Sequence, residues 1–375
     1  MVERIGIGVI GAGDISHSHL LAYRSRANHD LAKVVAIADV DEARATAQAT
    51  TYEIERTYAS VEQLLADPGV QAVSICTPPF LHVEQSIAAL RAGKHVIAEK
   101  PVSPTLAGLD AIATAERESG GAVFSGVFQH RLGQGAQQVK ALIDAGRFGH
   151  LRFGLSETLW QRPQSYYDVW WRGTWEKEAG GVSMGHGIHS IDMLAWLIGE
   201  PASLIADAAT VKLDIDVEDT SAATVRFRSG AIGQILVTVN AQDNRSRLEI
   251  FGDELQAVSS ESPYDPTREP FRFTSLDAAT AERARDSAAA AFPKETPHLH
   301  VGMIHDFLQA IAEGRPPLVT VDECRRSSQL ITGMYKSAMT GTRVEFPIAR
   351  DDPFYSQIPP EGFGLKPLPK RTEEP

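Results

Sequence analysis

A glycine-rich turn between an apolar segment and a helical one constrains the fold of this chain more than any other feature. Residues 4–10 form a short apolar run, typical of a buried parallel strand, and a helix-like segment begins near Ile15. Gly11 and Gly13 lie between them. Glycines let the backbone approach a diphosphate closely, and a helix N-terminus attracts its negative charge. The pattern therefore predicts a dinucleotide-binding turn, with Gly11, Gly13, Asp14 and Ile15 as binding residues.

An aspartate at the end of the next strand supports the same interpretation. Asp39 closes the apolar segment 33–38 and lies 26 residues after Gly13. A carboxylate at this place accepts both hydroxyls of the adenosine ribose and repels a 2′-phosphate, and the residue that follows is Val40 instead of a basic one. We therefore predict NAD as the cofactor, with NADP less favoured. A glycine turn capped by an aspartate, with no ligand, is the alternative.

Helix and strand patterns alternate through the first third of the chain and then change. The alternation predicts a doubly wound parallel sheet. Beyond Gln129, long strands are predicted over 203–211, 220–228 and 231–240, followed by 247–251, and residues 235–240 show a period-two pattern. The expected fold is an α/β N-terminal Rossmann domain plus an α+β C-terminal domain with a large open, mainly antiparallel sheet. We place these domains at 1–127 and 128–350, with an extended proline-rich tail at 351–375. The segment 259–297 is expected to be an insertion or long loop with an alanine-rich helical piece near 278–291, and helical periods return at 299–314 and 322–339.

The composition excludes several classes of protein. The formal net charge of −12 argues against a nucleic-acid binder, which needs a basic face. No run of about 18 apolar residues is present, so no membrane span is expected, and the N-terminus lacks the apolar region of a secretory signal. The two cysteines, Cys76 and Cys324, cannot form a disulfide framework, which favours a reducing, cytoplasmic location.

Further motifs follow in a fixed order along the chain. They are Thr77-Pro78-Pro79 with His82, Ala92-Gly93-Lys94-His95-Val96, Glu99-Lys100-Pro101, Gly187-Ile188-His189-Ser190-Ile191-Asp192 and Gly314-Arg315-Pro316-Pro317. With these motifs and the glycine turn, the chain resembles the Gfo/Idh/MocA oxidoreductase family over nearly its whole length. The resemblance implies an NAD(P)-dependent dehydrogenase of sugars or cyclic polyols, and subunits that pair through the open sheet. It adds Thr77, Pro78, His82, Glu99 and Lys100 to the cofactor-binding candidates.

Lys100 is the predicted catalytic base. Oxidising a secondary alcohol sends a hydride to the nicotinamide and a proton to a base within about 2.6–3.2 Å of the hydroxyl. The resemblance implies that the lysine of Glu-Lys-Pro holds this hydroxyl, and the role carries over to Lys100. Pro101 disfavours helical angles at the lysine, which helps to aim its side chain. A surface lysine before a loop is the alternative.

Two histidines are expected to share the proton handling. The family often has an aspartate four residues before a histidine; His189 matches the histidine, but Gly185 stands at the aspartate position. We hypothesise that His186 takes over part of the substrate binding of the missing acid and that His189 is a base or a relay partner of Lys100. A capping role for His186 and a core position for His189 are the alternatives. Asp192 is expected to orient His189 or to cap structure.

No metal is predicted in the site. The spacing His186-x-x-His189-x-x-Asp192 places possible ligands on one helix face, and His298-x-His300 adds another pair. No cysteine and no third clear ligand joins either set, and the resembling family generally uses no metal.

Aromatic and arginine side chains gather between residues 160 and 175. Aromatic rings pack on the C–H face of a sugar ring, and arginines bind hydroxyls. The gathered residues are Trp160, Arg162, Tyr166, Tyr167, Trp170, Trp171, Arg172 and Trp175. We therefore expect Trp160, Trp171 and Arg172 to bind substrate with Arg131, His186 and His189; an aromatic plug at a domain junction or subunit contact is the alternative. Gln129 is expected to face the nicotinamide carboxamide, whereas Arg131 also fits a structural ion pair.

The sequence thus predicts an NAD(P)-dependent oxidoreductase that acts on a CH–OH group of an unphosphorylated sugar, sugar derivative or inositol-like ring. Two alternatives stay open: an NAD-dependent glycosidase or lyase that works by transient oxidation, and a non-catalytic NAD-binding regulator. The expected partners are a sugar or polyol and further copies of the chain, as a homodimer or homotetramer. No nucleic acid and no membrane are expected.

Overall fold

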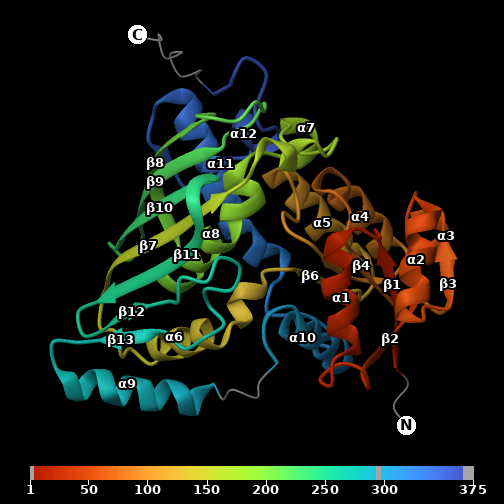
Figure 1. The fold of residues 1–375 in the computed structure, drawn as a ribbon, viewed down its shortest axis with the longest axis horizontal. Coiled ribbons are helices and arrows are strands. Elements are labelled where there is room, and N and C mark those ends of the chain that lie inside the picture. Colours follow the sequence, from red (N-terminus) through yellow and green to blue (C-terminus); the bar gives the residue numbers. More distant parts are fainter. Residues whose placement is uncertain (1–3, 293–296, 366–375) are drawn as a thin grey trace. The chain divides into compact units, whose positions relative to one another are not determined.

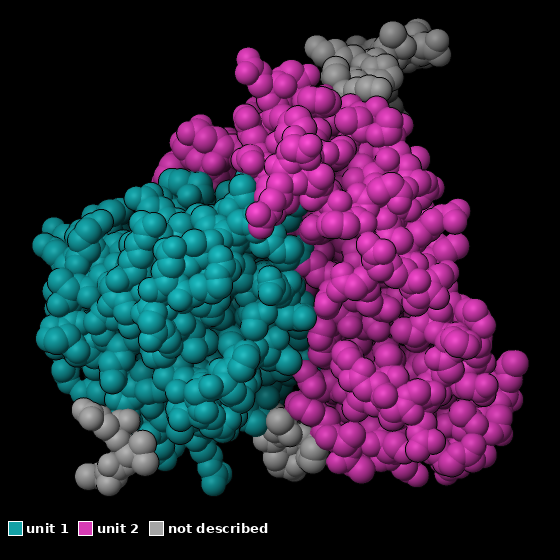
Figure 2. All heavy atoms as spheres, turned by 180° about the vertical axis from the view of Figure 1, so that it is seen from behind, with its two compact units in different colours: residues 1–133, 294–325 teal, residues 134–293, 326–375 magenta. Residues whose placement is uncertain are grey.

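The computed structural model describes residues 4–292 and 297–365 (Figure 1). The chain divides into two compact units, shown in different colours in Figure 2. The first unit comprises residues 1–133 and 294–325, and the second comprises 134–293 and 326–375. This division joins residues 297–325 to the nucleotide half, and the expected domain bounds stay a prediction. It falls inside one helix, α11 (Val321–Thr340).

The first unit is built on a six-stranded parallel sheet in the order β3-β2-β1-β4-β5-β6. Its strands are β1 (Ile5–Ile10), β2 (Ala32–Ala38), β3 (Arg56–Tyr58), β4 (Ala72–Ile75), β5 (His95–Ala98) and β6 (Phe124–Gly126). The helices are α1 (Asp14–Arg24), α2 (Glu42–Tyr52), α3 (Val61–Ala66), α4 (His82–Arg91), α5 (Leu106–Glu118) and α10 (Leu299–Glu313). This confirms the predicted Rossmann domain, with ligand-binding loops expected at the carboxyl ends of its strands.

Helix α10 belongs to the core of this first unit. Ile304, Phe307 and Leu308 are buried in one cluster with Ile7 of β1 and Ile97 of β5. The helical period of this segment was predicted, but period alone does not tell which sheet a helix covers.

Helix α2 and strand β3 escaped the sequence patterns. The α2 sequence is rich in alanine and threonine, and its buried side chains are Ala45, Gln48 and Ala49. Because none of these is a large apolar residue, the segment shows no clear amphipathic signal. Strand β3 has three residues, which is too short for a period-two pattern.

The second unit carries an eight-stranded sheet in the order β13-β12-β11-β7-β10-β9-β8-β14. Its strands are β7 (Leu151–Gln161), β8 (Pro201–Ala209), β9 (Thr220–Phe227), β10 (Ile232–Thr238), β11 (Asn240–Gly252), β12 (Gln256–Val258), β13 (Arg272–Thr274) and β14 (Val344–Glu345). Neighbouring strands are antiparallel except β7 and β10, which run parallel. The predicted open, mainly antiparallel sheet is therefore confirmed.

The burial pattern of β10 matches its predicted alternation. Ile235 and Val237 are buried, whereas Gln234 and Leu236 are partly exposed. Helix α8 (Ile188–Ile198) packs on β7 and β11 of the sheet, and α6 (Gln134–Asp144) packs on α8. One face of the sheet is thus covered by helices, and the other face carries partly exposed residues.

Within the expected insertion at 259–297, the alanine-rich helical piece predicted near 278–291 is confirmed as α9 (Ala278–Ala291), which packs on α6. Strand β13 also lies in this segment. The tail includes α12 (Pro353–Ser356), where Phe354 and Tyr355 are buried, so the expectation of an extended chain is wrong there. Residues 366–375 lie outside the described residues. Over the described part of the chain, no helix is long and apolar enough to cross a membrane.

Replacing Gly6 by alanine tests the packing of β1. A Cβ at this position would lie 1.9 Å from the Gly69 carbonyl oxygen, a main-chain atom that cannot rotate away. We expect Gly6→Ala to lower the free energy of unfolding by about 1–3 kcal/mol, the usual cost of overpacking. Urea unfolding followed by circular dichroism measures this. Gly364→Ala is the matched control, since its Cβ would meet nothing within 4 Å; equal losses in both variants would contradict the prediction.

Candidate active site

The glycine turn is held between the ends of two strands. The Gly11 amide donates to the Ala38 carbonyl of β2 at 2.8 Å. Gly11 has φ +95°, and a Cβ there would lie 2.9 Å from the carbonyl group of Cys76, which follows β4. Because both the backbone angle and this close approach exclude a side chain, only glycine fits.

Asp39 is half-buried, and its carboxylate stabilises the turn. Its Oδ2 accepts a hydrogen bond from the Ala12 amide at 2.7 Å, and its Oδ1 accepts one from the Asp41 amide at 2.9 Å. Each carboxylate oxygen retains a second lone pair for a ribose hydroxyl. The next residue, Val40, is 93% exposed and carries no charge that could bind a 2′-phosphate.

Gln48 completes the turn and was missed by sequence reasoning. Its Nε2 donates to the Ala12 carbonyl at 2.8 Å, and its Oε1 lies 3.0 Å from the hydroxyl of Ser16, which donates to Gly13. Ser16 stands where the dinucleotide-binding pattern Gly-x-Gly-x-x-Gly has its third glycine, and it is fully buried. A signal for Gln48 was absent because it lies on α2, the helix that the patterns did not reveal.

The residues at this sheet edge fit a dinucleotide. A Cβ on Gly13 would meet nothing within 4 Å, so the backbone at the start of α1 is open to an approaching group. No side chain caps this helix start, where exposed Asp14 and half-buried Ile15 follow. The Oε1 of Gln129, just after β6, is buried without a hydrogen-bond partner among the described residues, as a carboxamide-binding group would be.

His82 ties the loop after β4 to the loop after β5. Its Nε2 lies 2.8 Å from the Thr77 carbonyl oxygen, and its Nδ1 lies 2.8 Å from the Pro101 carbonyl oxygen. Burial lowers the pKa of His82, although both carbonyl contacts favour its protonated form. His82 thus holds the Thr77-Pro78 segment and the Lys100-Pro101 segment together. Its role as a direct cofactor ligand stays a prediction.

Glu99 anchors the lysine segment. Its Oε1 lies 3.1 Å from His19 Nε2 and 3.5 Å from His300 Nε2, and its Oε2 accepts from the Lys100 amide at 3.2 Å. Burial alone would raise the pKa of Glu99, but the two histidines hold it well below its usual range. The carboxylate is therefore ionised, and Lys100, which is half-buried, follows a fixed main-chain position.

The same three side chains have a geometry that a metal ion can use. In the described chain, His19, Glu99 and His300 form the group of potential ligands whose atoms lie within 4.8 Å of one another. The spacing of His186, His189 and Asp192 does not produce such a group there. The 3.1 Å between His19 and Glu99 is a hydrogen-bond distance, whereas His300 Nε2, at 3.5 Å, is buried without a hydrogen-bond partner among the described residues.

Arg131 is buried and ion-paired within the first unit. Its guanidinium contacts the carboxylate of Glu323 at 2.5 Å and the Glu323 carbonyl at 3.3 Å, and it lies over the ring of Phe128. The structure thus gives Arg131 the structural contact that the sequence left open. A substrate-binding role for it stays a prediction.

In the second unit, a π-helical turn presents the predicted histidines. This turn, η4 (Ser183–Gly187), runs directly into α8. Such turns recur at functional sites because they reorient side chains within a helix. His186 is buried within the turn, and half-buried His189 lies on the first turn of α8.

A second buried carboxylate organises this turn. The Glu218 carboxylate accepts from the Gly181 and Ser183 amides at 3.0 and 2.9 Å and from the Tyr335 hydroxyl at 2.9 Å. Burial raises the pKa of Glu218, although these hydrogen bonds favour its ionised form. Asp192, one turn after His189, accepts from the Ser327 hydroxyl. Glu218 was not recognised in the sequence, because nothing local marks a residue that bonds to a distant turn.

Aromatic rings and arginines form one cluster around His186. The His186 ring lies 5.3 Å from Trp160 and 5.6 Å from Tyr166, centroid to centroid. Arg162 stacks on Trp160 at 4.8 Å, and Arg172 stacks on Tyr166 at 3.9 Å and on Trp171 at 4.7 Å. The predicted gathering of these residues therefore exists in space, and their contact with substrate stays a prediction.

Trp175 lies outside this cluster. It packs on Tyr335 and donates to the Asp216 carbonyl at 2.9 Å.

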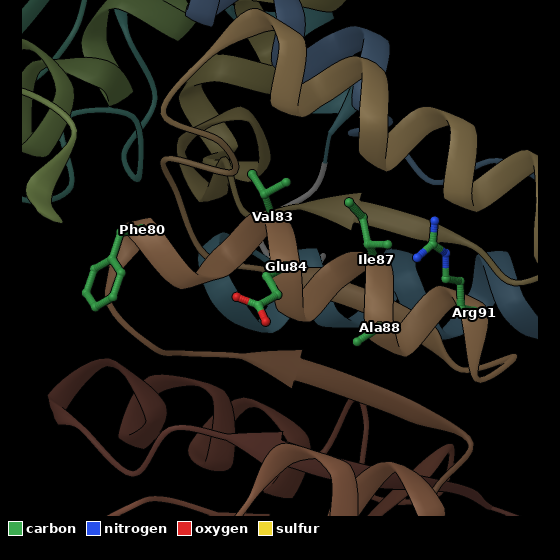
Figure 3. Close-up of a pocket in the computed structure, with 6 residues that line it drawn as sticks. All are labelled: Phe80, Val83, Glu84, Ile87, Ala88 and Arg91. Atoms are coloured by element: carbon green, nitrogen blue, oxygen red, sulfur yellow. The ribbon is translucent and has the colours of Figure 1, made fainter. Parts of the chain in front are cut away.

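A hollow runs along α4 (Figure 3). It is lined by Phe80, Val83, Glu84, Ile87, Ala88 and Arg91, which Figure 3 shows as sticks. None of them is a predicted site residue, so the hollow does not mark the candidate active site.

Comparison with protein families matches both halves of the chain. Residues 5–127 match the model of an oxidoreductase family with an NAD-binding Rossmann fold, Gfo/Idh/MocA. Residues 136–258 match the model of a Gfo/Idh/MocA C-terminal domain.

Individual relatives agree with these matches. Myo-inositol 2-dehydrogenase of Thermotoga maritima is 30% identical over 256 residues, which cover 66% of this chain and 73% of the relative. A 1,5-anhydro-D-fructose reductase of Ensifer adhaerens is 28% identical over 90% of this chain and 97% of its own. The crystal structure of the WlbA dehydrogenase from Bordetella pertussis, in complex with NADH and UDP-GlcNAcA, has a TM-score of 0.81 and 28% identity, covering 93% of this chain and 99% of that one.

Buried His130 makes stability depend on pH. Burial lowers its pKa to about 3, and the charges of His300 and Lys100 contribute. An unfolded histidine titrates near 6.5, so between this pH and about 3 the unfolded chain binds a proton that the folded chain does not. At pH values below 6.5, we expect this residue alone to lower the free energy of unfolding by up to about 1.4 kcal/mol for each pH unit.

Urea unfolding at pH 7, 6 and 5 measures this slope in wild type and in His130→Gln. The variant should show a shallower fall, because it has no proton to bind. Half-exposed His29 provides the control variant His29→Gln. A His130→Gln slope equal to that of wild type would contradict the assignment.

Proposed function

The chain belongs to the Gfo/Idh/MocA family of NAD-binding oxidoreductases, and from this premise we propose that it oxidises a secondary hydroxyl of a sugar, a sugar derivative or a cyclic polyol. The observation that carries the proposal is the contact of His82 with Thr77 and Pro101. This contact holds the lysine segment at the sheet edge that carries the dinucleotide turn. The names of the relatives, an inositol dehydrogenase and an anhydrofructose reductase, support a polyhydroxylated ring as substrate.

The chain's own residues divide the work of binding the cofactor. Gly11 and Gly13 let the main chain approach the diphosphate, and the start of α1 supplies amide donors. Asp39 accepts the ribose hydroxyls, which favours NAD over NADP. Gln129 hydrogen-bonds the carboxamide with its buried Oε1. When bound, the nicotinamide takes up the hydride that leaves the alcohol carbon.

Lys100 and His189 move the proton. The Lys100 side chain binds the reacting hydroxyl and orients its C–H bond, and the proton passes to Lys100 with His189 as relay. His186 binds a neighbouring hydroxyl, and the rings of Trp160 and Trp171 pack on the apolar face of the substrate. Arg172, stacked on Trp171, contributes a hydrogen-bond donor. Arg131 acts by fixing the segment after β6.

A second candidate function follows from Gly185. Because the usual aspartate is missing, a glycosidase or lyase that oxidises its substrate transiently is the alternative. It would cleave a glycoside without net NADH. A non-catalytic regulator would bind NAD and turn over no ring at all.

The test is a panel of free sugars, sugar acids and cyclitols with NAD and with NADP. The proposal expects net growth of absorbance at 340 nm with at least one ring, and a higher kcat/KM with NAD than with NADP. Glycoside cleavage without net NADH would select the second candidate. A cytoplasmic location, expected from two buried cysteines that form no disulfide within the described residues, stays a prediction.

Lys100→Met separates proton handling from cofactor binding. Methionine keeps the length of the side chain and cannot accept a proton, so we expect kcat/KM to fall about 10²- to 10⁴-fold. NADH binding, measured by fluorescence titration, should fall far less than kcat/KM, because Lys100 is only one of the cofactor-binding candidates and the glycine turn, Asp39 and Gln129 are unchanged. Exposed Lys212 provides the control Lys212→Met. Full activity in Lys100→Met would remove the lysine from the mechanism.

The open face of the large sheet is proposed to pair two copies of the chain. Ile205 of β8 is 44% exposed and Ile232 of β10 is 41% exposed, and strand pairing places both on the face opposite buried Ile235 and Val237. Large apolar side chains exposed on one face of a sheet can be buried by a subunit contact. We expect a homodimer or homotetramer by light scattering, and dissociation in Ile232→Lys. A monomeric wild type would contradict the proposal.

A further inference from the structure

Glu178 is a buried carboxylate that lies beside the histidine turn. It ends the short helix α7 (Trp175–Glu178) and is 4% exposed. Its Oε2 accepts a hydrogen bond from the Gly173 amide at 2.6 Å. A carboxylate buried to this degree carries a strong local field, because little water screens it.

Its other oxygen faces the position where the histidine turn lacks a side chain. A Cβ built on Gly185 would meet a single atom within 4 Å, the Oε1 of Glu178, at 3.3 Å. Gly185 immediately precedes His186 and lies about one turn before His189. The glycine therefore leaves room for an acidic group that comes from α7 instead of from the turn itself.

The charge of Glu178 reaches other groups of this region. Burial, with the Glu178 charge as a further cause, raises the pKa values of Tyr167 and Tyr335. Glu218, the other buried carboxylate here, accepts from two main-chain amides and the Tyr335 hydroxyl and so holds the turn. The Oε1 of Glu178 lies next to the position where Gly185 has no side chain.

We propose that Glu178 is a catalytic carboxylate of this enzyme: its Oε1, against the bare side of Gly185, accepts a hydrogen bond from a ring hydroxyl of the substrate. The inference rests on the proposed function. A carboxylate at this place selects a neutral hydroxyl donor and repels a phosphate, so the group bound next to the histidines is an unphosphorylated part of the ring. It also favours the positive charge that forms when a side chain of the site takes up the substrate proton.

The first experiment replaces Glu178 by glutamine, which keeps the shape and removes the charge. With the best ring of the panel, we expect kcat/KM of Glu178→Gln to fall about 10- to 100-fold, the usual effect of losing a hydrogen bond to a charged group. Binding of NADH and the melting temperature should stay close to those of wild type. Glu176→Gln is the matched control, because Glu176 lies on the same helix and is exposed.

The second experiment moves the acid to the turn. Gly185→Asp sets a second carboxylate against Oε1 of Glu178, so we expect a lower melting temperature and lower activity. The double variant Glu178→Gln with Gly185→Asp removes the repulsion and returns one carboxylate to the site. It should melt higher than Gly185→Asp and recover at least tenfold in kcat/KM over Glu178→Gln.

The outcomes separate this inference from the proposed function. An active wild type together with an equally active Glu178→Gln would overturn the inference alone. A folded, NADH-binding double variant with no recovery would also overturn it. A wild type that is inactive on the whole panel would overturn the proposed function and the inference together.

Discussion

The buried Glu99 carboxylate is the interaction on which the arrangement of the nucleotide half depends. It joins His19 of α1, His300 of α10 and the main chain at Lys100. Helix α1 begins at the glycine turn, and α10 comes from far along the chain. A charge buried this deeply is tolerated only when donors surround it, so losing one of these contacts would destabilise all three segments.

The second unit applies the same principle with different donors. Glu218 collects two amides and a tyrosine hydroxyl around the turn that precedes α8. In both units a buried carboxylate holds a stretch of main chain, and a side chain that we propose to act in catalysis follows within a few residues. The main chain next to Lys100 and just before His186 is thus held by these two carboxylates.

The features that the sequence predicted are those with local chemistry. The glycine turn, Asp39 and the Glu-Lys-Pro segment are recognisable because each has its own residue pattern within a few positions. The features that it missed depend on partners distant in sequence. Gln48 hydrogen-bonds to the glycine turn, Glu218 to the Gly181 amide, and Glu323 to the Arg131 guanidinium. Helix α10 was predicted as a helix, yet its place in the nucleotide half depends on packing of Phe307 that no period reveals.

The two anchoring carboxylates differ in the direction of their pKa shifts, and the difference follows from their donors. Both are buried, which favours the protonated form. The partners of Glu99 are imidazoles, which can carry positive charge, and its pKa is held well below the usual range. The partners of Glu218 are neutral amides and a hydroxyl, and its pKa is raised. The first unit therefore has a firmly ionised carboxylate next to Lys100, whereas the carboxylate that holds the histidine turn of the second unit is more readily protonated.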